Sequence, residues 1–105
     1  MKVMISQPFA GKSDEEIQAT RKRAIMYLNS QGHEIVNTFF EGDTYDEGYL
    51  TSFGVKNIPM YFLGKSIEMM ASCDAVYFCK GWKKARGCII ENAAAKAYGV
   101  KMIYE

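Results

Sequence analysis

The chain has 105 residues, of which 49% are apolar, and its formal net charge at neutral pH is +1. This size and composition predict one folded domain over residues 1–105 and exclude an intrinsically disordered chain. The balanced charge argues against partners such as nucleic acid polymers or acidic membranes, and no apolar run approaches the ~18 residues of a membrane-spanning helix.

The hydrophobic pattern alternates between short apolar runs, typical of buried parallel strands, and amphipathic stretches, typical of helices. Residues 2–6 form the first predicted strand. Ser13 and Glu16 have the spacing of a capping box, so we expect Ser13 to be the N-cap of the first helix. Gly32 is the expected stop of that helix, and residues 33–37 form the second predicted strand.

Residues 38–57 show no regular hydrophobic pattern, and they contain aromatic residues, acidic residues and three glycines. So long a connection in a compact domain is usually a functional loop or an interface, or it contains a helix that the pattern does not reveal. A helix is predicted over residues 58–72, a buried strand over 74–79, a helix over 87–98 and a last strand over 100–104.

This order of elements predicts an α/β fold with right-handed crossovers between parallel strands. We expect a small flavodoxin-like or Rossmann-like three-layer sandwich whose four-stranded parallel sheet has the order 2-1-3-4. In that order the first and third strands flank the topological switch point, and ligands bind beyond the carboxyl ends of such strands. Ser6 and Gln7 follow the first strand, and Cys79 and Lys80 end the third.

Glu91 is placed by the pattern in the first turn of the last helix, close to these strand ends. A carboxylate there could act as a nucleophile or a base, or it could simply interact with the helix dipole and N–H groups. In the preceding loop Trp82 offers a stacking surface, and Arg86 offers a guanidinium that can bind phosphate or carboxylate. Asp74 is a second candidate acid, or a turn residue that ends the preceding helix.

The first loop, with Gly11 and Lys12 before the Ser13 cap, could hold a phosphate against free N–H groups and the helix dipole. The alternative is an ordinary capped loop, because the sequence is not a Walker A motif. Tyr45 and Tyr49 could cover a ligand or fill a dimer interface. We expect a homo-oligomer, a dimer or larger, because a four-stranded sheet leaves edges to cover and the long connection is aromatic.

The three cysteines, Cys73, Cys79 and Cys88, lack C-x-x-C spacing, and His33 has no ligand-like neighbour. An odd number of cysteines without a secretion signal predicts reduced, buried thiols and a cytoplasmic location. We expect no metal ion and no cofactor.

Three segments resemble the nucleoside 2-deoxyribosyltransferase-like superfamily. They are a strand beginning Asp74-Ala-Val-Tyr-Phe, the helix start Gly87-Cys-Ile-Ile-Glu91, and the short strand Lys101-Met-Ile-Tyr104. The first strand, its loop, the capped helix and the second strand also follow the family order, so the likeness covers nearly the whole chain. It looks closest to a compact branch of the superfamily found in bacteria and their phages.

The resemblance implies an enzyme, a glycosidase or transferase that cleaves the N-glycosidic bond of a deoxynucleoside or its 5′-monophosphate. Glu91 would be the nucleophile at the anomeric carbon, and Asp74 would orient the sugar or the proton transfer. The resemblance implies phosphate contacts from the first loop, and the same cleft supplies the other expected substrate contacts; together these residues are Ser6, Gln7, Gly11, Lys12, Trp82, Arg86 and Gly87.

The chain departs from the family pattern at several positions. Ala85 stands where the transferases have an additional Asp, Asn92-Ala93 follows Glu91 where the family has x-Gly, and Met4 or Ile5 replaces a first-strand tyrosine. The segment that completes a neighbouring subunit's site in the transferases does not follow Glu105. Hydrolysis is therefore expected over base exchange. The alternatives are a non-catalytic binder of a nucleotide or nucleotide-derived signal in the same cleft, and an interaction module without a small-molecule ligand.

Overall fold

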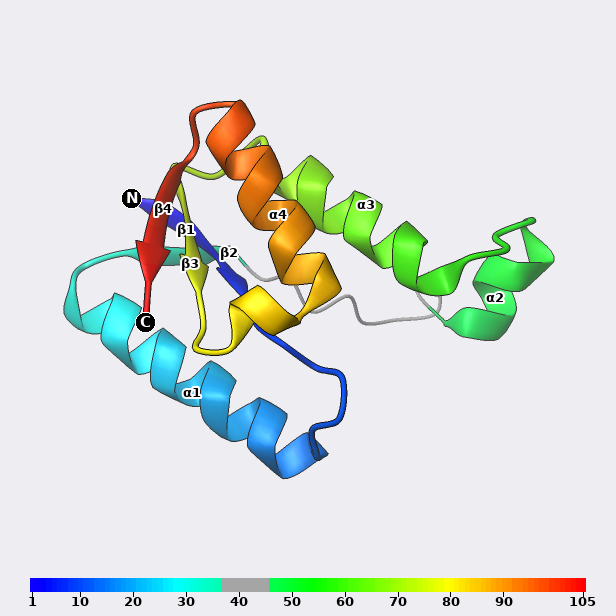
Figure 1. Ribbon diagram of the computed structural model, residues 1–105, viewed down its shortest axis with the longest axis horizontal. Coiled ribbons are helices and arrows are strands. Elements are labelled where there is room, and N and C mark those ends of the chain that lie inside the picture. Colours follow the sequence, from blue (N-terminus) through cyan, green and yellow to red (C-terminus); the bar gives the residue numbers. More distant parts are fainter. Residues whose placement is uncertain (37–45) are drawn as a thin grey trace.

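The computed structural model describes residues 1–36 and 46–105 (Figure 1). Its strands are β1 (Lys2–Ser6), β2 (Glu34–Val36), β3 (Ala75–Phe78) and β4 (Lys101–Tyr104). Its helices are α1 (Asp14–Ser30), α2 (Glu47–Ser52), α3 (Ile58–Met70) and α4 (Arg86–Ala97), with a short 3-10 helix, η2 (Trp82–Lys84), before α4.

All pairings between these strands are parallel, and the sheet order is β2-β1-β3-β4. Val3 of β1 lies opposite Ile35 of β2 on one side and opposite Ala75 of β3 on the other. The expected α/β fold with strand order 2-1-3-4 is therefore confirmed. The two central strands are buried along almost their whole length, which explains why their sequences are continuous apolar runs.

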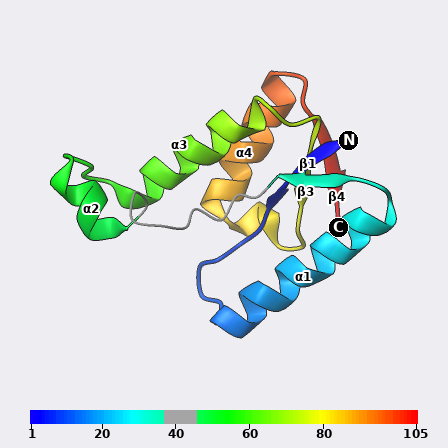
Figure 2. The ribbon, with the colours of Figure 1, turned by 180° about the vertical axis from the view of Figure 1, so that it is seen from behind.

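Helices cover both faces of the sheet and make three layers, with α1 on one face and α3 and α4 on the other (Figures 1 and 2). Successive strand residues point to opposite faces, so each face has its own core. On the α1 face the buried core consists of Val3, Ile5, Ala24, Leu28, Ala75, Tyr77 and Cys79. On the other face it consists of Met4, Met70, Val76, Phe78 and Ala95.

The helix starts follow local capping chemistry. The Ser13 side chain accepts a hydrogen bond of 3.2 Å from the Glu16 backbone N–H, so the predicted N-cap of α1 is confirmed. Asn57 caps α3 in the same way, at 3.0 Å from the Met60 N–H. Helix α4 begins at Arg86, one residue before the predicted Gly87, so Glu91 is its sixth residue and lies in the second turn rather than the first.

The long connection contains a helix that the sequence pattern did not reveal. Asp46 caps α2 by accepting a hydrogen bond of 3.1 Å from the Tyr49 N–H. Helix α2 packs against the start of α3 and projects away from the sheet (Figure 1). Tyr45 and residues 38–44 lie outside the described residues. No helix in the described part of the chain is long and apolar enough to span a bilayer.

Candidate functional site

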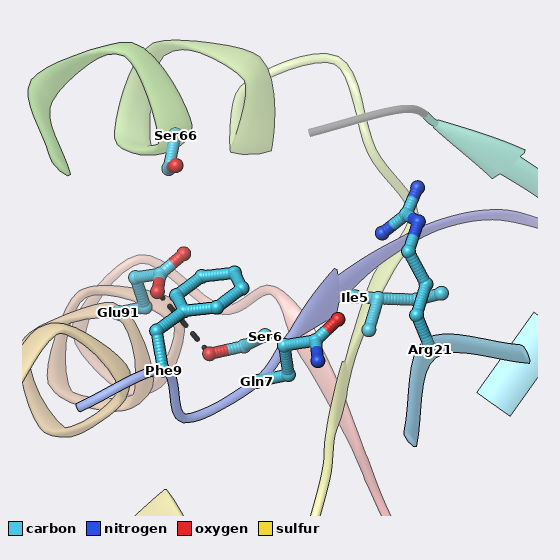
Figure 3. Close-up of a pocket in the computed structure, with 7 residues that line it drawn as sticks. All are labelled: Ile5, Ser6, Gln7, Phe9, Arg21, Ser66 and Glu91. Carbon is cyan, nitrogen blue, oxygen red and sulfur yellow. Dashed lines mark hydrogen bonds between the residues drawn. The ribbon is translucent and has the colours of Figure 1, made fainter. Parts of the chain in front are cut away.

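A recess of about 330 Å³, its open mouth included, lies beyond the carboxyl end of β1 (Figure 3). The end of β1 and the following loop form its floor, α1 and α3 contribute one side chain each, and α4 contributes Glu91. The lining residues are Ile5, Ser6, Gln7, Phe9, Arg21, Ser66 and Glu91. This is the edge of the sheet where an open α/β fold with this strand order is expected to bind a ligand.

Glu91 is buried, with 8% of its surface exposed. Its Oε1 accepts a hydrogen bond of 3.2 Å from Ser6 Oγ, and its other carboxylate oxygen points into the recess (Figure 3). Burial raises the pKa of Glu91 to about 7, and the Ser6 hydrogen bond opposes that shift. In the second turn the carboxylate is beyond the range in which a helix dipole acts strongly. The Glu91 carboxylate therefore faces the recess and does not interact with the N-terminus of its helix.

Ser6 is the last residue of β1 and lies opposite Phe78 of β3 in the sheet register. Its hydroxyl donates its hydrogen bond to Glu91 of α4, and its proximity lowers the pKa of the Cys88 thiol, one turn earlier. Burial nevertheless raises the pKa of the Cys88 thiol, so this side chain is a buried structural thiol. Ser6 thus joins the central strand to α4 and fixes the direction of the Glu91 carboxylate.

Gln7 is 5% exposed and lies at the start of the loop that follows β1. Its Nε2 donates a hydrogen bond of 3.0 Å to the backbone carbonyl of Ile17 in α1. Its Oε1 is directed toward the recess and receives a hydrogen bond from none of the described residues (Figure 3). Gln7 therefore presents a buried acceptor to the recess.

Four lining residues were not predicted from the sequence, and one of them, Ile5, is a buried core residue of β1. Phe9 lies at the rim with about half of its surface exposed, and Ser66 faces the recess from α3, across from Glu91 (Figure 3). Arg21 of α1 is half-buried at the other side, and desolvation lowers the pKa of its guanidinium. The position of Arg21 at the recess can be predicted from the helical periodicity of α1 once the face of the sheet that α1 covers is known. The sequence gives no such signal for Ser66, because helix packing decides which side of α3 faces the recess.

Asp74 lies at the opposite edge of the sheet. It precedes β3, and its Oδ2 accepts a hydrogen bond of 2.8 Å from the backbone N–H of Lys2 at the start of β1. In a parallel sheet, residues before a strand lie at the amino edge, whereas the recess is at the carboxyl edge. The structure therefore does not bring Asp74 together with Glu91, and it supports the alternative of a structural turn residue.

The other predicted contacts also lie outside the recess lining. Gly11 and Lys12 form an exposed turn in which the Lys12 N–H donates to the Phe9 carbonyl at 3.2 Å. The Trp82 ring packs against Phe78 and Tyr104, with ring centroids 5.4 and 5.6 Å away. That ring belongs to the core and does not offer a stacking surface to the recess.

The start of α4 is likewise placed away from the recess lining. Arg86 is exposed at the first position of the helix, and Gly87 follows it. Neither residue lines the recess. Of the predicted site residues, the structure brings together Ser6, Gln7 and Glu91.

A carboxylate at residue 105 holds the carboxyl edge of the sheet together. Glu105 accepts a hydrogen bond of 2.7 Å from the Lys80 N–H and one of 2.6 Å from Arg23 Nε in α1. Both partners lower the pKa of the Glu105 carboxyl, and Arg23 has the larger effect. The loop after β3 is thereby fixed to α1 on the side of the sheet opposite α4.

The described residues contain no group of three His, Cys, Asp or Glu side chains placed to hold a metal ion. Cys79 is fully buried, and burial raises the pKa of its thiol to about 12. Cys73 is half-buried, with a thiol pKa that burial also raises. All three cysteines are free thiols.

Comparison with known proteins gives one family match. The model of a family described as a domain of unknown function, DUF4406, matches residues 1–104. No curated protein and no solved structure matches the chain. Because the match spans nearly every residue, from the first strand of the sheet to the last, the chain belongs to the family described as Domain of unknown function (DUF4406).

Proposed function

We propose that this protein cleaves the N-glycosidic bond of a deoxynucleoside or its 5′-monophosphate, with Glu91 as the nucleophile. One observation carries the proposal. The Glu91 carboxylate is buried at the carboxyl edge of the sheet, Ser6 holds one of its oxygens, and the other oxygen is directed into the recess. We also propose that the protein acts in the cytoplasm, where its three cysteines would stay reduced.

The reaction follows from the position of that oxygen. It attacks the anomeric carbon, the bond between that carbon and the base nitrogen breaks, and the base leaves with the electron pair. Water then attacks the anomeric carbon of the glycosyl ester, which releases the sugar and a proton and restores the carboxylate. No second carboxylate lines the recess among the described residues, so water at the open mouth supplies the proton to the departing base.

The acidity of Glu91 sets the pH dependence of this chemistry. With a pKa of about 7, roughly half of the Glu91 side chains are ionised at neutral pH. Only the ionised form is nucleophilic, so base release increases as the pH rises through 7.

Replacing Glu91 tests the proposal directly. Wild type is incubated with the four deoxynucleosides and their 5′-monophosphates, and free base is measured by chromatography. We expect Glu91→Ala and Glu91→Gln to lower base release from the accepted substrate by at least about a thousandfold, because the nucleophile is lost. Glu68→Gln is the matched control, since Glu68 is an exposed carboxylate of α3 outside the recess. Undiminished release by the Glu91 variants would exclude Glu91 as nucleophile.

A second function is favoured by the single acid in the recess lining. Glycoside cleavage commonly uses two carboxyl groups, and Asp74, the other expected acid, lies at the far edge of the sheet. The same recess would then bind a nucleotide or nucleotide-derived signal without chemistry. A rise in melting temperature with a nucleotide, together with no free base after hours of incubation, would support this function over the first.

A further inference from the structure

The side-chain amide of Gln7 has only one orientation that its surroundings allow. The backbone carbonyl of Ile17 can accept a hydrogen bond but cannot donate one. The NH₂ end of the amide must therefore face Ile17, where Nε2 lies 3.0 Å from the carbonyl oxygen. A reversed amide would place two acceptors against each other. The oxygen end is thus fixed toward the recess.

Leaving the Gln7 Oε1 without a hydrogen-bond donor is unfavourable in free energy. Gln7 is 5% exposed, and none of the described residues donates a hydrogen bond to Oε1. Buried polar atoms in folded proteins are nearly always paired, and an acceptor left without a donor is unfavourable. A ligand group with a polar hydrogen would pair this oxygen, whereas a ligand group with only lone pairs would be repelled by it.

We propose that Gln7 determines ligand specificity, because its Oε1 accepts a hydrogen bond from a hydroxyl group of the ligand in the recess. This assignment differs from the phosphate contact that the family resemblance implies for Gln7, because phosphate oxygens are acceptors at this position. Lys12 and Gly11 do not line the recess, and Ser6 donates its hydrogen to Glu91. The identification of the donor as a sugar hydroxyl of a deoxynucleoside rests on the proposed function.

The test pairs a change in the protein with a change in the ligand. The probes are the 2′-deoxynucleosides and their 3′-deoxy and 5′-deoxy analogues, compared by kcat/KM for base release or by Kd where no base is released. Wild type should prefer the parent compound over one analogue by about 10- to 100-fold, the range expected when a buried acceptor loses its donor. In Gln7→Met, a side chain of similar length without polar hydrogen-bonding ends, that preference should fall to within about threefold.

Two further variants separate specificity from folding. Gln18→Met is the control, because Gln18 is an exposed glutamine of α1, and it should keep the wild-type preference. If Gln7→Met does not fold, Gln7→Glu replaces it. The protonated carboxyl of that variant can donate to the Ile17 carbonyl and still present an acceptor to the recess. Its preference in Kd should match wild type at low pH, where the neutral carboxyl keeps the contact with Ile17 and still accepts from the ligand.

The possible outcomes distinguish the specificity role of Gln7 from the glycosidase function. A preference that is the same in wild type and Gln7→Met for every analogue overturns the role of Gln7, even if Glu91-dependent base release is intact. A preference that depends on Gln7 without any base release supports the specificity role and contradicts the glycosidase function. If no probe reacts or raises the melting temperature of wild type, both proposals are overturned.

Discussion

Ionisation of Glu91 opposes folding, because the recess gives the charged carboxylate one hydrogen bond in place of the water it loses. The folded protein holds the pKa at about 7, whereas the unfolded chain returns it to the usual value of 4.5. Between these values the folded state binds the proton more tightly than the unfolded state does. The contribution of this proton to stability is fully present below pH 4.5 and is lost as the pH rises through 7.

Glu91→Gln should therefore stabilise the protein in a pH-dependent way. At pH 8 the variant should exceed wild type in free energy of unfolding by about 3 kcal/mol, because a neutral amide avoids the cost of the buried charge. At pH 4 the two proteins should differ little. Urea unfolding at pH 4, 6 and 8 measures this difference, with Glu68→Gln as the exposed control. A difference that does not change with pH would contradict the raised pKa.

The position of a single residue follows from the sequence where the order of the strands sets it. Glu91, Ser6 and Gln7 come soon after the carboxyl ends of β1 and β3, so their meeting could be predicted from the strand order. The direction of the Gln7 amide could not be predicted, because the Ile17 carbonyl fixes it. Asp74 comes directly before β3, and an acid before a strand lies at the amino edge of the sheet, so the strand order itself separates Asp74 from Glu91.

Local chemistry defines the helices, and this is the level at which the sequence was most informative. The Ser13 cap, the Gly32 stop and the start of α3 near Pro59 are short-range signals that do not depend on the rest of the fold. Helix α2 has only six residues, too short to show helical periodicity, so it was hidden within the long connection. The position of the Trp82 ring could not be predicted from the sequence, because its packing on Phe78 and Tyr104 depends on tertiary structure.

Ser13→Ala should lower the stability of α1 and of the whole protein. The Ser13 side chain accepts the hydrogen bond of the Glu16 N–H, and loss of such an N-cap costs about 1 kcal/mol. Thermal and urea unfolding should both show the loss. Lys12→Ala, next to the cap but outside the hydrogen bond, is the control and should unfold like wild type. Equal stability of the two variants would mean that water replaces the cap at no cost.

At the scale of the whole molecule, the three layers leave part of their apolar surface uncovered. Phe53, at the end of α2, is 72% exposed, and Met60, in the first turn of α3, is 66% exposed. Helix α2 extends from the body, and the Cα radius of gyration of 13.8 Å slightly exceeds the ~13 Å typical of a compact chain of this length. Apolar side chains on a projecting element are typical of a surface that another chain covers.

We therefore expect the protein to self-associate through α2 and the start of α3. Light scattering after size-exclusion chromatography should give a mass of at least twice the 11.9 kDa of the chain. Replacing Phe53 and Met60 together by Ser should shift the protein to the monomer. Met26→Ser is the matched control, because Met26 is 64% exposed on α1, in the opposite layer. A monomeric wild type would contradict this expectation.

The strand order has a consequence for how the chain folds as it is synthesised. β1 is a central strand, yet the residue that Lys2 contacts at the start of β3 is 72 positions later, and Glu91 is 85 positions after Ser6. While the ribosome is making α1, β1 has no partner strand, and while it makes α2 and α3, β1 has only the three-residue β2 as a partner. Contacts so distant in sequence form slowly. One side of β1 therefore stays unpaired until β3 has left the exit tunnel, and this apolar strand is then exposed to chaperones that bind emerging chains.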